Sequence, residues 1–397
     1  MTPTTPSRRP RRAVYLDYNA TAPVRPEVFK AMRPFLLGEF GNPSSVHVLG
    51  QRARRAVEEA RARVAEFLGA SAGEIVFTSS GSEADAMAVR GAALRAFESS
   101  GGKKRAVVSS PIEHEAVLGA LDMLERRGLE IKLLPVGADG TVVAKALPGL
   151  LDDSTALVTV MHANNETGAV QPVRELAGIC RERGVVFHTD AVQSAGKIPV
   201  DAREIGADLL SISGHKLGAP KGIGALYIRR GIALVPLIAG AQEKNRRGGT
   251  ENVPGIVGLG EACRLSRAEA LDSSRYAALR SRMLQEALKI PGSRLTAGPD
   301  GVLPHMAHFC FEGVSGPELV AALDLEGIAV SSGPACSSGS PEPSHVLLAM
   351  GMAPEIARGA LRVSMGFATK EADVERFLQA LPGVVAALRR VPAALRP

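Results

Sequence analysis

The 397-residue sequence contains no tryptophan, four tyrosines and four cysteines. So few aromatic side chains offer a single-stranded nucleic acid little to stack on. The cysteines lie far apart without a CxxC pair, which argues against a disulfide framework or a structural zinc site. No apolar run approaches the roughly 18 residues of a membrane span, and the start lacks the apolar core of a secretory signal. We therefore expect a cytoplasmic protein with reduced thiols that binds no nucleic acid and no membrane.

Acidic residues are absent from the first 13 positions, where four arginines stand among prolines. These arginines account for most of the formal net charge of +6, and they leave about +2 for the body of the chain. We expect residues 1–13 to be a disordered Arg/Pro-rich leader. With 45% hydrophobic and 22% charged residues, the chain has the composition of a globular protein, and its length suits a two-domain enzyme.

Between residues 74 and 230, short β-rich runs alternate with helical segments, which predicts an α/β fold with a mainly parallel, helix-covered sheet. About ten residues join the last two strands, which is short for a helical crossover and favours an antiparallel final strand. We expect a large domain at 26–262 and a smaller α+β domain formed by 14–25 and 263–397. The seven strands are expected at 75–77, 106–110, 131–136, 155–161, 184–190, 208–213 and 224–230.

The segment SISGHKLGAPKGIGALY places Ser213, His215 and Lys216 just past a predicted buried strand and before a glycine-rich turn. Ligands bind at this end of the strands in open α/β sheets. A partly desolvated lysine there can form a Schiff base with a carbonyl cofactor. For this motif alone, a surface lysine in a turn is an equally simple interpretation.

Two further motifs follow predicted strands. In HTDAVQSAGK, Asp190 ends a strand, and an acid opposite a pyridine nitrogen keeps that nitrogen protonated, so that the ring can absorb electrons. The alternative role of Asp190 is a helix N-cap. In FTSSGSEADA, Gly81 and Ser82 stand where a helix should begin, and the free N–H groups and dipole of a helix start favour phosphate.

The four cysteines differ in their surroundings. Cys180 and Cys263 lie in predicted helices and Cys310 lies in an apolar strand, so we expect all three in the core. Cys336 stands between SSGPA and SSGSPEPS, a context that is too polar and glycine-rich for burial and indicates an exposed loop. A thiolate can form and move there.

Nine motifs follow one another along the chain, from about residue 14 to about residue 370. They read LDYNATAPVRPEV, FGNPSSVH, FTSSGSEAD, EHEAVL, MHANNETGAVQPV, HTDAVQSAGK, SGHKLGAPKGIGALY, RRGGTENV and SSGPACSSGSPEPSHVL. In this order they resemble the aminotransferase class V group and, more closely, the group I cysteine desulfurases of the NifS/IscS type. So many motifs in one order are very improbable by chance.

The resemblance implies a pyridoxal 5'-phosphate (PLP)-dependent transferase fold of type I, with 26–262 as the PLP-binding domain, in a homodimer with active sites at the subunit interface. It assigns Lys216 as the Schiff-base lysine and Asp190 as the partner of the pyridinium nitrogen. Gln193 and Asn165 are expected near the phenolic oxygen of the ring. His114 is expected to stack on the ring and to handle the proton of the substrate thiol.

The resemblance also implies which residues bind the cofactor phosphate and the substrate carboxylate. Arg362, in LRVSMG, is the implied clamp for the substrate carboxylate, together with Asn165, and a guanidinium fork suits that task. A solvent-facing arginine at a strand start is the alternative. The implied phosphate ligands are Gly81, Ser82, Ser213, His215 and, from the second subunit, Thr250.

The implied reaction removes sulfur from L-cysteine, giving L-alanine and a persulfide on Cys336. The uninterrupted stretch around Cys336 resembles the long loop of group I enzymes, which implies transfer to an acceptor protein such as an iron–sulfur scaffold. A selenocysteine lyase or another PLP enzyme of fold type I, such as an aminotransferase, is the nearest alternative. A non-catalytic scaffold is disfavoured because Lys216, Asp190 and Cys336 are all present. His305 and His308 lack a third ligand nearby in sequence, so we expect ordinary packing and no metal.

Overall fold

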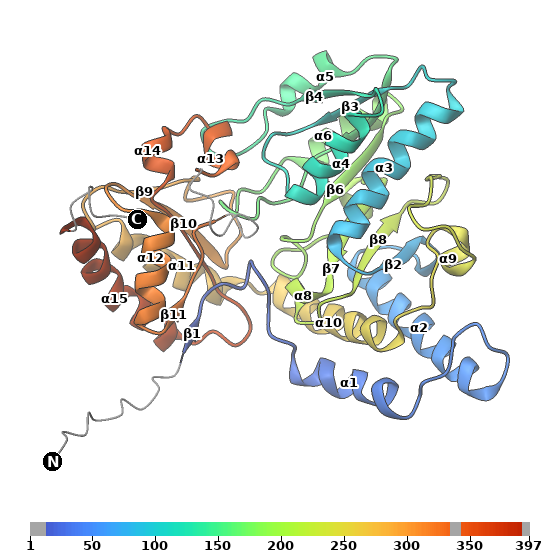
Figure 1. Ribbon diagram of the computed structural model, residues 1–397, viewed down its shortest axis with the longest axis horizontal. Helices are drawn as coiled ribbons and strands as arrows, with labels where there is room; N and C mark the ends of the chain where they lie inside the picture. Colours follow the sequence, from blue (N-terminus) through green and yellow to red (C-terminus); the bar gives the residue numbers. More distant parts are fainter. Residues whose placement is uncertain (1–12, 334–342, 391–397) are drawn as a thin grey trace.

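The computed structural model describes residues 13–333 and 343–390 (Figure 1), so most of the predicted leader and the segment that contains Cys336 lie outside the described residues. Its centre is a seven-stranded sheet with the strand order β2-β8-β7-β6-β5-β3-β4. Strand β8 is antiparallel to both neighbours, and all other pairs are parallel. The strands are β2 (Ile75–Thr78), β3 (Ala106–Ser109), β4 (Glu130–Leu133), β5 (Thr155–Thr159), β6 (Val186–Asp190), β7 (Leu209–Ser213) and β8 (Gly224–Ile228).

The predicted α/β class, the seven strands and the antiparallel final strand are confirmed. The strands β3, β4, β5 and β8 end earlier than expected. The segment predicted as 155–161 leaves β5 after Thr159, where the backbone N–H of Met161 donates to the Glu113 carboxylate instead of to a strand. The segment predicted as 131–136 ends at Leu133 because β4 is the partly exposed edge strand, and Val136 forms a separate bridge with Val142.

Alternate residues of the strands supply two different hydrophobic cores, as the pleat of a sheet requires. On one face, Val76 and Leu226 pack with helices α3 (Gly81–Ser99) and α4 (Glu115–Glu125). On the other face, Phe77 and Tyr227 belong to a core that includes α2 (Val48–Phe67), α6 (Val173–Glu182) and α10 (Val253–Leu271). Helix α1 (Pro26–Leu37) packs on α10.

A second group of elements, largely orange and red in Figure 1, lies beside the large sheet and has a core of its own. An antiparallel sheet in the order β12-β10-β9 and a parallel pair, β1-β11, pack with three helices. The elements are β1 (Val14–Tyr15), β9 (Ser293–Leu295), β10 (Met306–Phe311), β11 (Ile328–Ala329), β12 (Ala360–Ser364), α11 (Ser274–Ala287), α12 (Gly316–Leu325) and α15 (Glu371–Arg390).

This second core draws on Val14 and Leu16 and on residues from Leu279 onward, while α10 packs on α1 and α2. The division into 26–262 and 14–25 with 263–397 is compatible with these contacts and stays a prediction. No helix of the described ranges is long and apolar enough to cross a membrane. The remaining short helices are α5 (Leu147–Leu150), α7 (Ala202–Ile205), α8 (Gly214–Leu217), α9 (Gln242–Asn245), α13 (His345–Ala349) and α14 (Pro354–Ala357).

Candidate active site

A cavity of about 220 Å³ lies where the carboxyl ends of β6 and β7 meet the start of α3. This edge is where open α/β sheets bind ligands. Nine residues that were predicted from the sequence line this cavity, although they come from five separate stretches of chain. They are Gly81, Ser82, His114, Asn165, Asp190, Gln193, Ser213, His215 and Lys216, and they are joined by Ala20, Ser80, Asp85, Met161, Ala163 and Val192.

Lys216 lies on α8, directly after β7, and is half-buried. Gly218 ends this short helix with a φ of 87°, a left-handed conformation that glycine adopts without strain. The Nζ atom of Lys216 donates to the backbone carbonyls of Asn19 and, at 3.0 Å, Ala20. The N-terminal segment therefore runs past the amine and fixes its position in the cavity.

Asp190 is the last residue of β6 and is 6% exposed. Its Oδ1 accepts the N–H of Val192 at 2.8 Å, in a turn and not in the helix that the N-cap alternative would require. Burial raises the pKa of this carboxyl, whereas His114, Val192 and Lys216 oppose the rise. The cavity thus holds both an amine, on Lys216, and a buried carboxyl group, on Asp190.

The start of α3 forms the third wall of the cavity. Ser80 caps this helix by accepting the N–H of Glu83 at 3.0 Å, which leaves the N–H groups of Gly81 and Ser82 as donors without an intrahelical acceptor. A Cβ atom at Gly81 would lie 2.9 Å from Val192 Cγ2 and 3.0 Å from Ser213 Cβ. Only glycine therefore allows this helix start to close on the end of β7.

Two histidines that line the cavity, His114 and His215, each have a hydrogen-bonding partner at Nδ1. His114 Nδ1 accepts the N–H of Ala116 at 3.1 Å, so the neutral ring carries its proton on Nε2. Burial, partly opposed by Asp190 and reinforced by Lys216, lowers the pKa of His114. His215 Nδ1 lies 3.1 Å from Thr21 Oγ1, and burial with the charge of Lys216 lowers the pKa of His215 to about 4.

Asn19 is a central residue that the sequence reasoning missed, although its motif LDYNATAP was noted. It is 1% exposed, and its carbonyl accepts hydrogen bonds from Lys216 and, at 3.1 Å, from Gln193 Nε2. Its Nδ2 donates to Asn165 O at 3.2 Å, and its Oδ1 lies 2.7 Å from His305 Nε2. One asparagine thereby links the N-terminal segment to three parts of the site.

Three predicted residues do not line this cavity. Arg362 is 1% exposed and lies behind Asn165, whose carbonyl accepts from Arg362 Nη1 at 2.9 Å. Thr250 is exposed and does not line the cavity of its own chain. Cys336 lies outside the described residues.

His305 and His308, the two histidines considered as metal ligands in the sequence analysis, are both buried. His305 contacts Asn19, and His308 Nδ1 lies 2.8 Å from Thr296 Oγ1. Burial lowers the pKa of His308 to about 3. Among the residues that the structure describes, no cluster of three or more histidine, cysteine, aspartate or glutamate side chains could hold a metal ion.

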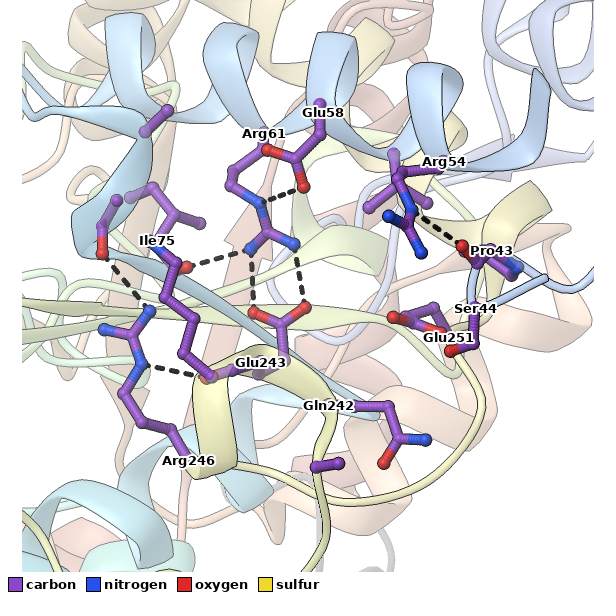
Figure 2. A pocket seen from close by; sticks show the side chains of 15 residues that line it. Pro43, Ser44, Arg54, Glu58, Arg61, Ile75, Gln242, Glu243, Arg246 and Glu251 are labelled. Atoms are coloured by element: carbon purple, nitrogen blue, oxygen red, sulfur yellow. Dashed lines mark hydrogen bonds and ion pairs between the residues drawn. The ribbon is translucent and has the colours of Figure 1, made fainter. Parts of the chain in front are cut away.

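A larger hollow of about 440 Å³ lies away from these residues, between α2 and the turn at α9 (Figure 2). Its wall holds charges that pair with one another: Arg61 forms two hydrogen bonds with Glu243, at 2.7 and 2.9 Å, and a third with Glu58. None of the predicted site residues lines it. The smaller cavity is therefore the candidate active site.

The chain is similar to several known proteins over nearly its whole length. The model of the aminotransferase class-V family matches residues 14–377. Cysteine desulfurase IscS of Methanosarcina thermophila is 44% identical over 382 residues, covering 96% of this chain and 94% of the relative. Cysteine desulfurase IscS of Dictyoglomus turgidum is 46% identical over 384 residues, covering 96% of both chains.

Solved structures agree with these relatives. A NifS-like protein has a TM-score of 0.87 at 35% identity, and the match covers 95% of this chain and 100% of that protein. The structure of SspA in complex with cysteine has a TM-score of 0.78 at 36% identity, over 88% of this chain and 98% of that one. The likeness to both extends across the large sheet and the second group of elements.

Proposed function

The chain belongs to the aminotransferase class-V family, and from this premise we propose that it is a PLP-dependent cysteine desulfurase, which converts L-cysteine to L-alanine and takes up the sulfur as an enzyme persulfide. The observation that carries the proposal is the joint placement of Lys216, Asp190 and the start of α3 around one cavity. The named relatives and the cysteine-bound structural neighbour support the substrate.

The residues of the cavity fit the chemical groups of PLP. Lys216 offers an amine to its aldehyde, Asp190 offers a carboxylate to its ring nitrogen, and the N–H groups of Gly81 and Ser82 offer donors to its phosphate. Ser213 and His215 extend the phosphate site. When bound, PLP stabilises the negative charge that develops at the substrate Cα atom.

The protein side chains position the substrate and move its protons. We propose that Lys216 Nζ removes the proton from the substrate Cα and that Asp190 keeps the charge of the ring nitrogen fixed. His114, whose pKa is lowered by burial, carries its hydrogen on Nε2 and can donate a hydrogen bond from that atom to the substrate thiol. Gln193 and Asn165 hold the phenolic oxygen of the ring, and Arg362 with Asn165 binds the substrate carboxylate.

The sulfur acceptor that we propose is Cys336. The other three cysteines are buried, as the sequence predicted. Burial raises the pKa of Cys180 and of Cys310 to about 12 and raises that of Cys263 further. Because the thiolate is the nucleophile, burial and a raised pKa disfavour all three thiols as sulfur acceptors near neutral pH. This supports Cys336 by elimination.

We further propose a cytoplasmic homodimer in which Thr250 completes the phosphate site of the other subunit. The exposure of Thr250 and its absence from the cavity of its own chain support this arrangement. The persulfide would then pass to an acceptor protein such as an iron–sulfur scaffold, which the IscS relatives make plausible.

The first experiment records the visible spectrum of the purified protein and measures alanine and sulfide formed from L-cysteine with a thiol reductant. We expect a yellow protein that makes both products. Cys336→Ser should keep the colour and lose turnover, Lys216→Ala should lose the band of lysine-bound pyridoxal, and Cys180→Ala should retain both. A Cys336→Ser protein as active as the wild type would instead support a lyase or an aminotransferase.

A further inference from the structure

A second carboxyl group, that of Asp85, lines the same cavity as Asp190 and has no part in the proposed function. Asp85 lies on α3 and is 1% exposed. Its Oδ1 accepts no hydrogen bond from any residue in the ranges 13–333 and 343–390. A buried carboxylate with an empty acceptor is costly, and the cost disappears when the group holds a proton.

Among the groups that face Asp85 from the sheet, Ser211 forms a hydrogen bond that lowers the pKa of Asp85, but none supplies a positive charge. His188 of β6 has its Nε2 atom 3.8 Å from Asp85 Oδ1, but burial lowers the pKa of His188 to about 3 and keeps the ring uncharged. The ring is engaged on both sides, with Thr159 Oγ1 at 2.8 Å and Ser211 Oγ at 3.0 Å. The remaining neighbour on β6 is Asp190 itself, whose negative charge disfavours ionisation of Asp85.

The groups from the other elements favour charge on Asp190. Lys216 of α8 and His114, at the start of α4, both lower the pKa of Asp190, and Val192 donates its N–H to that carboxylate. Glu113, next to α4, raises the pKa of Asp85. Burial is the largest contribution for both carboxyl groups, and it raises the pKa of each.

We propose that Asp85 is the proton-holding partner of Asp190: the two buried carboxyl groups carry one proton between them, on Asp85, and one negative charge, on Asp190. Two neighbouring buried carboxyl groups ionise together only at a large cost. Asp85 is then a positioning residue, because its neutral form leaves a single anion to face the ring nitrogen. The inference rests on the proposed function for the role of Asp190.

The first test needs no cofactor. The thermal midpoint of the apo-protein is compared between about pH 5 and about pH 8.5 for the wild type, Asp85→Asn and Asp190→Asn. Since the pKa of Asp85 is raised by folding, its stabilising contribution is full below its unfolded value and is lost as pH rises toward its folded value. Between about pH 5 and about pH 8.5, the thermal midpoint of Asp85→Asn should therefore fall by less than that of the wild type, the difference being about 4 °C or more.

Coupling between the two groups gives the sharper outcome. In Asp190→Asn the neighbouring charge is gone, so the alkaline loss of thermal midpoint should also shrink. The double variant should reduce that loss by less than the sum of the two single effects. An Asp85→Asn protein with the alkaline loss of the wild type would overturn the proposal. So would strictly additive effects of the two substitutions.

The second test measures PLP affinity by absorbance titration at neutral pH. Asparagine resembles a protonated aspartate, so Asp85→Asn should bind within about threefold of the wild type, whereas Asp190→Asn should bind more than about tenfold more weakly. Equal losses in both variants would place negative charge on Asp85 and contradict the proposal. Failure of the proposed function would show as a colourless or inactive wild type and would leave the apo-protein results untouched.

A spectroscopic measurement covers the case that Asp85→Asn does not fold. Two further acids near the cavity are buried and have a raised pKa, Glu113 and Glu166, so infrared spectra are recorded on the apo-protein that carries both Glu113→Gln and Glu166→Gln. At neutral pH a carbonyl stretch of a protonated carboxyl group should persist and should weaken when Asp190→Asn is added. A spectrum without that band would contradict a proton on Asp85.

Discussion

Arg247 forms an ion pair with Glu83, the third residue of α3, with Arg247 Nε 2.7 Å from Glu83 Oε1 and Nη2 3.2 Å from Oε2. Glu83 also accepts the N–H of Ser79 at 2.7 Å. A carboxylate in this first turn stands beside the donors that we assign to the cofactor phosphate. The positive charge of Arg247 compensates the negative charge of Glu83, and the ion pair connects the 242–250 segment, which carries Thr250, to the start of α3.

Removal of Arg247 should therefore weaken PLP binding. In Arg247→Gln, Glu83 stays ionised without its partner and repels the phosphate, so we expect the dissociation constant of PLP to rise about tenfold. The double variant Arg247→Gln with Glu83→Gln removes the repulsion and should recover most of the affinity. Absorbance titration of the apo-proteins measures both. If the double variant binds PLP as weakly as Arg247→Gln alone, Arg247 acts by shaping the 242–250 segment and not by compensating the charge of Glu83.

The large sheet and most of the cavity could be predicted from the sequence because their signals are local. Each strand is a short β-rich run, and the polar residues that end β6 and β7 come to one edge in any parallel sheet. Asp85 also had a local signal. Along α3 it belongs to a buried stripe at helical spacing, in which it is the single acid: Gly81, Ala84, Asp85, Ala88 and Ala92.

Asn19 and Arg362 could not be placed in this way. Asn19 reaches Lys216 across 197 positions of sequence, and Arg362 reaches Asn165 across the same separation. No periodicity encodes contacts between an N-terminal segment and two sheets that pack side by side. The resemblance gave Arg362 its expected role, but the structure alone shows that it lies behind the cavity wall and is held by several partners.

The Arg61–Glu243 pair shown in Figure 2 should be important for stability. The side chains are 11% and 3% exposed, and Glu243 begins a run of three residues with positive φ, at 49°, 58° and 64°. Glu243→Gln leaves the Arg61 charge buried with less compensation, so unfolding free energy should fall by about 3 kcal/mol. Denaturant unfolding measures the loss.

The matched control is Glu59→Gln on the same helix as Arg61. Glu59 pairs with Arg55 at 2.9 Å, but both side chains are largely exposed, so the cost should stay below about 0.5 kcal/mol. Similar losses in the two variants would mean that burial of the Arg61–Glu243 pair has no special effect on stability.

Glu113 should make the folded protein less stable at alkaline pH. Burial raises its pKa from 4.5 to about 8, although Ser110 and the Met161 N–H bind the carboxyl group. Its contribution is therefore complete below pH 4.5 and is lost as pH rises toward 8, with a slope of up to about 1.4 kcal/mol per pH unit. Glu113→Gln should lack this decline. Parallel stability curves for the two proteins between pH 5 and pH 8 would refute a raised pKa.

Asp17 should compete with the substrate for Arg362. Asp17 Oδ1 lies 2.9 Å from Arg362 Nη2, while Nη1 donates to the carbonyls of Asn165 and Gly333. Arg362 Nε is buried and donates to no acceptor among the described residues. Asp17→Asn removes the competing charge, so KM for L-cysteine should fall about threefold with kcat little changed.

The same substitution should lower the unfolding free energy by about 2 kcal/mol, because it weakens the compensation of a buried guanidinium. Cysteamine, which has no carboxylate, is the control ligand, and its inhibition constant should not respond to Asp17→Asn. Arg362→Lys loses the planar fork and should raise KM instead. If Asp17→Asn instead raises KM as Arg362→Lys does, Asp17 orients the Arg362 guanidinium toward the substrate. That result would contradict competition between Asp17 and the substrate carboxylate.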